Sequence, residues 1–199
     1  MKNFNLIKTL SVFVLILGLS FGNTLLAQDL YKLAGKPELK VKGTSTLHDW
    51  EMASAQAQGK AEIIMDGNTL KGVKSATVIM KSASIKSGTD KMDALAYESL
   101  KTSKFPEITF VLTSFRVLDN NRAQAIGNMT IAGTTKPVTF NVQTSTKSDL
   151  VNMTGEANIK FTDFNIKPPT ALLGTVKTGN ELKLSFKVSF QPTTTLSKN

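Results

Sequence analysis

Hydrophobic and polar residues alternate along most of the chain after residue 37. In ELKLSFKVSF, residues 181–190, every second side chain is apolar and all the others are polar. Alternation with a period of two predicts a β-strand with one buried and one solvated face, as is typical of antiparallel sheets. Similar segments predict eight strands, at about 38–47, 50–64, 70–81, 107–117, 122–132, 136–146, 151–162 and 180–190.

One segment has helical spacing instead. In TDKMDALAYESLK, residues 89–101, apolar side chains recur at intervals that place them on one helix face: Met92, Leu95, Ala96 and Leu100. Asp90 is a suitable N-cap, and Asp93 adds favourable negative charge to the first turn. Because Pro106 disfavours helical geometry at Phe105, the helix should end before these residues. Its apolar face is expected to cover an open end of the sheet structure.

Eight half-buried strands can bury their apolar faces in a two-sheet sandwich or in a closed barrel. A barrel has no sheet edges, and its interior is just wide enough for side chains or one small ligand. The inward positions include small residues, which leave volume in a barrel but also permit close packing of two sheets: Ala61, Ala76, Ala125, Gly127, Gly155 and Ala157. Alternation alone therefore leaves both a cavity and a filled core open.

The first 27 residues have a different character. Lys2 and Lys8 precede or flank the apolar stretch LSVFVLILGL, and Ala27 suits the position before a cleavage site. About ten apolar residues are too few to span a bilayer as a helix. We therefore expect a signal peptide at 1–27, a single domain at 28–192 and a flexible tail at 193–199, with the mature protein periplasmic or secreted.

Composition excludes several kinds of chemistry. The chain has no cysteine and one histidine, which rules out disulfides and a histidine–cysteine zinc site. The formal net charge is +9, but the basic residues are spread singly without interleaved aromatic residues, so no nucleic-acid partner is predicted. A basic surface is compatible with transient contact with an anionic membrane surface. The pattern indicates no oligomeric state.

The only histidine and the only tryptophan lie together in STLHDW, residues 45–50. Ser45, His48 and Asp49 are the residue types of a catalytic triad, but triad partners usually come from distant parts of a chain, and no G-x-S-x-G elbow is present. We instead expect a turn at His48 and Asp49, because an aspartate side chain can bond nearby backbone amides. Trp50 is expected to be an apolar plug at the end of the barrel. No enzymatic activity is predicted.

Several stretches together resemble the YceI-like family of exported lipid-binding proteins: STLHDW, MDALAYESLKTSKFPEITF, GNMTIAGTTKPVTFNV, FTDFNIKPP and ELKLSFKVSF. The similarity covers about residues 38–190. The resemblance implies an all-β fold, an eight-stranded antiparallel lipocalin-like barrel with one short α-helix near the mouth. It also implies a central cavity for a long polyisoprenoid or related amphiphilic lipid. The extra histidines and arginines that some members carry before the helix are absent from SIKSGTDKMD.

We therefore predict a binding protein that holds an isoprenoid or quinone-like lipid as carrier, store or sensor, with no metal and no other cofactor. The alternative is a structural or partner-binding barrel with a filled core and no ligand. The predicted tail-binding residues are apolar and inward-facing: Ile108, Phe110, Leu112, Met129, Ile131, Phe140, Leu184, Phe186 and Val188. The residues predicted at the mouth and headgroup are His48, Asp49, Trp50, Met92, Leu95, Tyr97, Lys104 and Phe105.

Overall fold

The structure, a computed structural model, describes residues 28–119 and 121–193. The predicted signal peptide at 1–27 and most of the predicted tail at 193–199 lie outside the described residues. No helix in the described part of the chain is long and apolar enough to cross a membrane.

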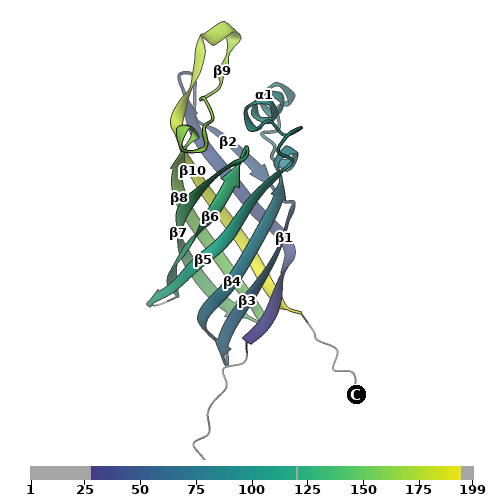
Figure 1. Cartoon of the computed structure of the whole chain (residues 1–199), viewed down its shortest axis with the longest axis vertical. Helices are drawn as coiled ribbons and strands as arrows, with labels where there is room; N and C mark the ends of the chain where they lie inside the picture. The colour runs from purple at the N-terminus through teal and green to yellow at the C-terminus, as the bar shows by residue number, and fades with distance from the viewer. Residues whose placement is uncertain (1–27, 120, 194–199) are drawn as a thin grey trace, which may run out of the picture.

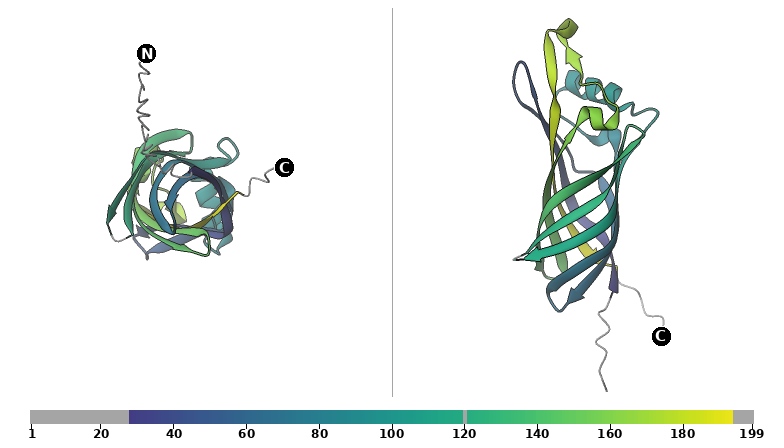
Figure 2. Two further views of the ribbon diagram at one scale, coloured as in Figure 1. Left: turned by 90° about the horizontal axis from the view of Figure 1, so that it is seen from below. Right: turned by 60° about the vertical axis from the view of Figure 1, so that its left-hand side comes forward.

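The strands form a closed antiparallel barrel, as the sequence predicts (Figures 1 and 2). The first strand, β1 (Gln28–Ser45), pairs with the last, β10 (Val176–Pro192), and this pairing closes the sheet. The other described strands are β2 (Trp50–Ser54), β3 (Ala57–Asp66), β4 (Thr69–Lys81), β5 (Glu107–Asp119), β6 (Arg122–Ile131), β7 (Thr134–Lys147), β8 (Leu150–Lys160) and β9 (Thr170–Ala171).

The predicted strand at 50–64 is two strands, β2 and β3, separated by residues 55 and 56. Both pair with β1, β2 with its C-terminal half and β3 with its N-terminal half, so together they fill one position in the barrel wall. At the break, the Gln56 N–H donates to Ser54 Oγ at 3.1 Å. Since β9 is only a two-residue addition to β10, the closed wall has the eight strand positions that alternation predicts.

The strand β1 begins ten residues earlier than the predicted start at 38. Gly35 has a φ of 66°, and the register with β10 shifts between Ala34 and Glu38. A bulge at this glycine therefore divides β1. Gly35 and Pro37 interrupt the alternation of apolar residues at this place, which explains why the pattern did not predict the first half of the strand.

The helix α1 (Asp90–Leu100) lies at one end of the barrel, the upper end in Figure 1. It is preceded by the 3-10 helix Ser82–Ser84, and Lys101 caps its C-terminus in the left-handed conformation. The helix ends before Pro106, as predicted, but its N-cap is Thr89 and not Asp90. The segment between β8 and β10 adds the 3-10 helices Phe161–Phe164 and Leu172–Gly174 at the same end.

Candidate ligand-binding cavity

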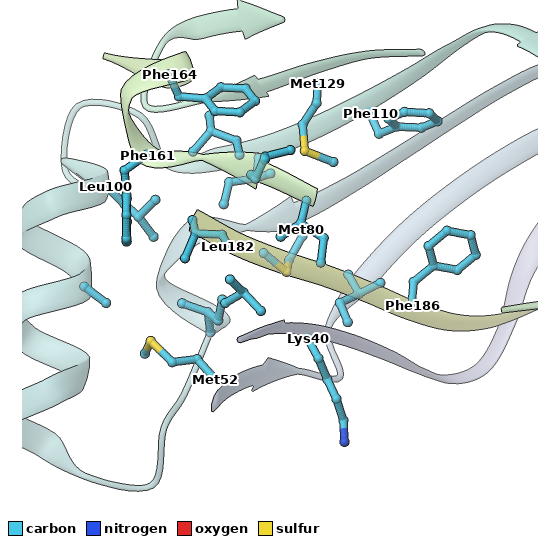
Figure 3. Close-up of a pocket in the computed structure, with 18 of the residues that line it drawn as sticks. Lys40, Met52, Met80, Leu100, Phe110, Met129, Phe161, Phe164, Leu182 and Phe186 are labelled. Atoms are coloured by element: carbon cyan, nitrogen blue, oxygen red, sulfur yellow. The ribbon is translucent and has the colours of Figure 1, made fainter. Parts of the chain in front are cut away.

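The barrel encloses a cavity of about 560 Å³ that is lined mainly by apolar side chains (Figure 3). This volume lies within the range of about 300–1,000 Å³ that is typical of ligand pockets. All of the residues predicted to contact a lipid tail line the cavity: Ile108, Phe110, Leu112, Met129, Ile131, Phe140, Leu184, Phe186 and Val188. The structure therefore brings together inward-facing positions of β5, β6, β7 and β10 around one space.

The cavity is closed at the end opposite α1 by tightly packed side chains. Tyr31, Ile63, Ala123 and Val151 are each at most 4% exposed, and none of them lines the cavity. Burial raises the pKa of the Tyr31 hydroxyl, as do, to a smaller extent, two nearby aspartates. Within the barrel, the part of β10 that lines the cavity runs from residue 182 to residue 190, which corresponds to about 20 Å along the axis of a tilted barrel. Val176 and Thr178 extend this wall at the mouth. The interior is thus a blind channel long enough for one extended chain.

Aromatic rings cover the glycines of the inward face. A Cβ added at Gly127 would lie 2.4 Å from the Phe110 ring, and one added at Gly155 would lie 2.5 Å from the Phe186 ring. Phe140 packs edge-on against both rings, with centroid distances of 5.5 and 5.3 Å. Of the two possibilities that the sequence left open for the small inward residues, close packing therefore applies to these two glycines. Space is left at the alanines that line the cavity: Ala61, Ala76 and Ala125.

The STLHDW turn forms part of the mouth, and its hydrogen bonds account for most of its polar residues. Ser45 Oγ accepts from the backbone N–H groups of Leu47 and His48 at 3.2 and 3.1 Å, and donates to the His48 carbonyl at 2.7 Å. The Trp50 indole N–H donates to the Thr44 carbonyl at 3.0 Å. The serine, and not Asp49 as predicted, thus organises the turn. His48 and Trp50 both line the cavity.

Two of the predicted mouth residues on α1, Met92 and Leu95, line the cavity, but Tyr97 does not. The Tyr97 hydroxyl donates to the Ile85 carbonyl at 3.2 Å, and Lys86 Nζ lies 5.0 Å from the centre of its ring. Tyr97 therefore fastens the helix to the chain that precedes it, and its side chain is not directed at the channel.

The remaining predicted mouth residues, Asp49, Lys104 and Phe105, are also absent from the cavity wall. The Phe105 ring packs over Gly133, where an added Cβ would lie 2.4 Å from it, and Lys104 Nζ lies 5.3 Å from the centre of the same ring. The Phe105 ring thus packs against the β6–β7 turn, and Lys104 lies over that ring. Asp49 is exposed, and its carbonyl lies 2.6 Å from His48 Nδ1.

The mouth has a further wall, built from residues that are not among the predicted mouth residues. Phe161, Phe164 and Ile166 line the cavity, and Phe164 is only 2% exposed. They follow the last alternating residues of β8, where the chain leaves the sheet in a 3-10 turn that ends at Asn165 with a φ of 55°. One feature of the sequence could have indicated this wall. Three apolar residues lie within six positions, and an asparagine, a residue type that adopts the left-handed conformation, lies beside them.

The charged groups on the cavity wall are all basic. Lys40, Lys91 and Lys160 line it, together with His48, and no aspartate or glutamate does so in the described part of the chain. Lys40 and Lys160 form ion pairs with Glu51 and Glu181, at 3.2 and 3.1 Å. The cavity therefore combines an apolar channel with a few cationic groups.

A buried carboxylate holds α1 beside the mouth. Asp93, 5% exposed, accepts hydrogen bonds from the backbone N–H of Ser87 at 2.7 Å and from its hydroxyl at 2.8 Å, and Lys86 Nζ lies 3.3 Å away. The backbone hydrogen bond from Ser87 is the main cause that lowers the pKa of Asp93, against the opposing effect of burial. Asp93 thus links the first turn of the helix to the preceding loop.

Replacing Asp93 by asparagine should loosen α1 without unfolding the barrel. Hydrogen bonds to a charged acceptor contribute about 1.5–3 kcal/mol, and the amide retains only part of that contribution. We expect amide hydrogen exchange in α1 to become about tenfold faster at neutral pH, while the strands stay protected. Asp90→Asn, an exposed carboxylate in the same turn, is the matched control and should leave the exchange rates unchanged.

The pH dependence of this contact follows from the lowered pKa of Asp93. The carboxylate stabilises the fold fully above the pKa of an unfolded aspartate, about 3.9, and this contribution is lost as the pH falls through the lowered folded value. Protection factors of α1 should therefore be constant between pH 8 and 5 and fall only in stronger acid. A fall in these protection factors near pH 6 would contradict the role of the Asp93 carboxylate in holding α1.

Within the described residues, no group of three or more histidine, cysteine, aspartate or glutamate side chains could hold a metal ion. The cavity wall combines apolar side chains with a few basic ones, an arrangement that suits binding of an amphiphile.

Comparison with known proteins gives consistent matches. The family model that matches the chain is the YceI-like domain, over residues 33–190. The proteins named Protein YceI from Escherichia coli O157:H7 and from Shigella flexneri are each 35% identical over 74 residues, which cover 34% of this chain and 38% of theirs. These alignments therefore span about two fifths of the length of the curated relatives.

Solved structures share the fold at low sequence identity. The crystal structure of Burkholderia cenocepacia BcnA has a TM-score of 0.63 at 18% identity, and the match covers 77% of this chain and 95% of that one. A polyisoprenoid binding domain from Saccharophagus degradans, implicated in plant cell wall breakdown, has a TM-score of 0.60 at 12% identity, covering 82% and 98%. The Campylobacter jejuni YceI protein has a TM-score of 0.55 at 21% identity, covering 66% and 79%.

Proposed function

The chain belongs to the YceI-like domain family, and on this premise we propose that it binds one long-chain polyisoprenoid or similar amphiphilic lipid inside the barrel. In this proposal the protein is a carrier, store or sensor of the lipid and carries out no reaction on it. The blind apolar channel of about 560 Å³ is the observation that carries the proposal. The similarity in fold to a polyisoprenoid binding domain supports it.

The energetics of such binding are favourable. An isoprenoid tail dissolves poorly in water, and burial of apolar surface removes that cost. If about 300 Å² of tail is buried at about 25 cal/mol per Å², the gain is about 7–8 kcal/mol. That gain corresponds to a dissociation constant of the order of micromolar before the cost of ordering the chain is subtracted. The tail alone therefore supplies useful affinity.

The mouth would select the headgroup. Lys91 lines it from the first turn of α1, and His48 lines it from the β1–β2 turn, so a polar or weakly anionic headgroup would have donors at the open end. Quinone carbonyls and prenol hydroxyls accept hydrogen bonds from such groups. The tail would then extend past Phe110 and Phe186 toward the closed end.

The N-terminal pattern supports an exported protein, and we propose that lipid binding takes place in the periplasm or outside the cell. The alternative of a structural or partner-binding barrel requires a core filled by side chains. The cavity between the inward faces of the strands argues against a filled core.

Extraction of the purified protein tests the proposal directly. Protein expressed with its leader in a bacterial host should release a long-chain lipid into organic solvent, and native mass spectrometry should detect the corresponding complex. Protein of bare chain mass that also fails to take up added quinones and prenols would overturn the proposal.

A further inference from the structure

Three leucines are exposed on the two segments that project beyond the cavity mouth. Leu172 and Leu173 form the tip of the β9–β10 hairpin and are 72% and fully exposed, and Leu47 at the tip of the β1–β2 turn is 68% exposed. The hairpin projects farthest from the barrel at this end (Figures 1 and 2). We call these three residues the leucine rim. Side chains of this type are favoured in apolar surroundings, so their position at the tips requires an explanation.

The backbone of the hairpin holds its two leucines outward. Leu172 and Leu173 have φ values of 50° and 56°, in the left-handed region that bulky side chains rarely adopt. The turn is held by a hydrogen bond from the Thr175 N–H to the Leu172 carbonyl at 3.2 Å, and by the pairing of Val176 with Ala171. The fold thus accepts an unfavourable backbone conformation at the place where two apolar side chains face solvent.

The two projecting segments are joined at their bases. The Thr46 N–H donates to the Lys177 carbonyl at 3.0 Å, and the Lys177 N–H donates to Thr46 Oγ1 at 3.1 Å. Leu47, Ala171 and Val176 also line the cavity. The leucine rim is therefore one connected structure that is continuous with the mouth of the channel.

The hairpin segment of the rim is basic. Residues 165–180 include Lys167 and Lys177 and no acidic residue. Both lysines are exposed, as is Lys91 at the mouth, and none of the three forms an ion pair within residues 28–119 and 121–193. Exposed carboxylates also lie at this end, outside residues 165–180: Asp49 in the turn that carries Leu47, Asp90 and Glu98 on α1, and Asp163 in the 3-10 helix Phe161–Phe164. Exposed apolar tips with adjacent cations are suited to the interface of an anionic bilayer.

We propose that the leucine rim docks on the surface of an anionic lipid bilayer, with Leu172 and Leu173 in the interfacial layer and the mouth facing the lipids. Separate tips around an opening can enter a fluid interface, whereas a stable protein interface needs a continuous surface of about 800 Å² on each partner. The biological purpose of this docking rests on the proposed lipid-binding function. The contact itself can be measured independently of lipid uptake.

Vesicle flotation with the full mature chain tests the docking. Wild-type protein should bind vesicles of phosphatidylcholine with phosphatidylglycerol, and should bind pure phosphatidylcholine vesicles less. Leu172→Asn/Leu173→Asn should weaken the partition at least tenfold, and asparagine tolerates the left-handed backbone at both positions. Leu118→Asn is the matched control, since Leu118 is 49% exposed on β5 at the opposite end. It should leave the partition unchanged.

Charge reversal provides a second test. Lys167→Glu/Lys177→Glu should weaken binding to vesicles with phosphatidylglycerol at least tenfold and reduce its dependence on salt. Equal partition of wild type and the double asparagine variant, or a dimer in ultracentrifugation that this variant abolishes, would overturn the docking proposal. Uptake of a quinone delivered from solution should be normal in all these variants. Failure of that uptake in the wild type would count against the lipid-binding function and not against docking.

Discussion

Replacing Ala76 by phenylalanine is expected to abolish uptake of a long-chain lipid and to leave the barrel at least as stable as the wild type. Ala76 on β4 is paired with Ala61 on β3, and both line the cavity. A phenyl ring at this position would enter space that the tail is proposed to occupy. Since an eight-stranded barrel holds one small ligand, we expect the affinity to fall at least a hundredfold, or about 3 kcal/mol.

Trp50 gives a direct measurement of this uptake. It is the only tryptophan and it lines the mouth, so a bound quinone should quench its fluorescence. Ser75→Phe is the matched control, because Ser75 is exposed on the outer face of the same strand. The control should titrate like the wild type. Normal quenching in Ala76→Phe would contradict a ligand site beside Ala76. A loss of affinity that is explained by a loss of stability of the variant would contradict it as well.

Alternation predicted the wall of the cavity because side chains on a strand point to opposite faces with a fixed period. Once the barrel closes, one face of every strand must point inward. For this reason Phe110, Phe140 and Phe186 could be assigned to the interior before their neighbours were known. The break between β2 and β3 did not disturb the assignment, since both strands keep the same place beside β1.

The mouth was harder to predict, because it is built from a helix and turns whose orientation depends on tertiary contacts. Met92, Leu95 and Tyr97 are close in sequence on α1, yet only the first two line the cavity. The hydrogen bond from Tyr97 to Ile85 and the buried contact of Asp93 with Ser87 fix the rotation of the helix. No local pattern in the sequence indicates these partners.

The volume of the cavity was also beyond the sequence pattern. The alternation pattern does not distinguish alanine from glycine at inward positions, but aromatic rings from neighbouring strands pack over the two glycines. Phe110 on β5 covers Gly127 on β6, and Phe186 on β10 covers Gly155 on β8. Whether a small residue leaves space depends on the side chains across the strand pair. The register between strands, which sets those neighbours, is therefore needed before a volume can be predicted.

Replacing Gly127 by alanine should destabilise the barrel by about 2–3 kcal/mol, which corresponds to a fall in Tm of about 5–10 °C for a chain of this size. The added Cβ would lie 2.4 Å from the Phe110 ring and 2.6 Å from the Val111 carbonyl oxygen. The ring can move into the cavity, but the carbonyl belongs to the backbone of β5. The clash with this carbonyl can therefore be relieved only by a shift of the whole strand. Urea unfolding should measure the resulting loss in the free energy of unfolding.

Gly155→Ala is the matched comparison, because its Cβ would lie 2.5 Å from the Phe186 ring but 3.3 Å from the nearest carbonyl oxygen. Here the ring can turn into the channel, so we expect a loss of about 1 kcal/mol and a weaker affinity for lipid. Adding Phe186→Leu should restore much of the stability of Gly155→Ala, whereas Phe110→Leu should restore only part of that of Gly127→Ala. Equal rescue at both positions would mean that the backbone contact at Gly127 carries no cost, and that ring packing alone sets the space left for a ligand.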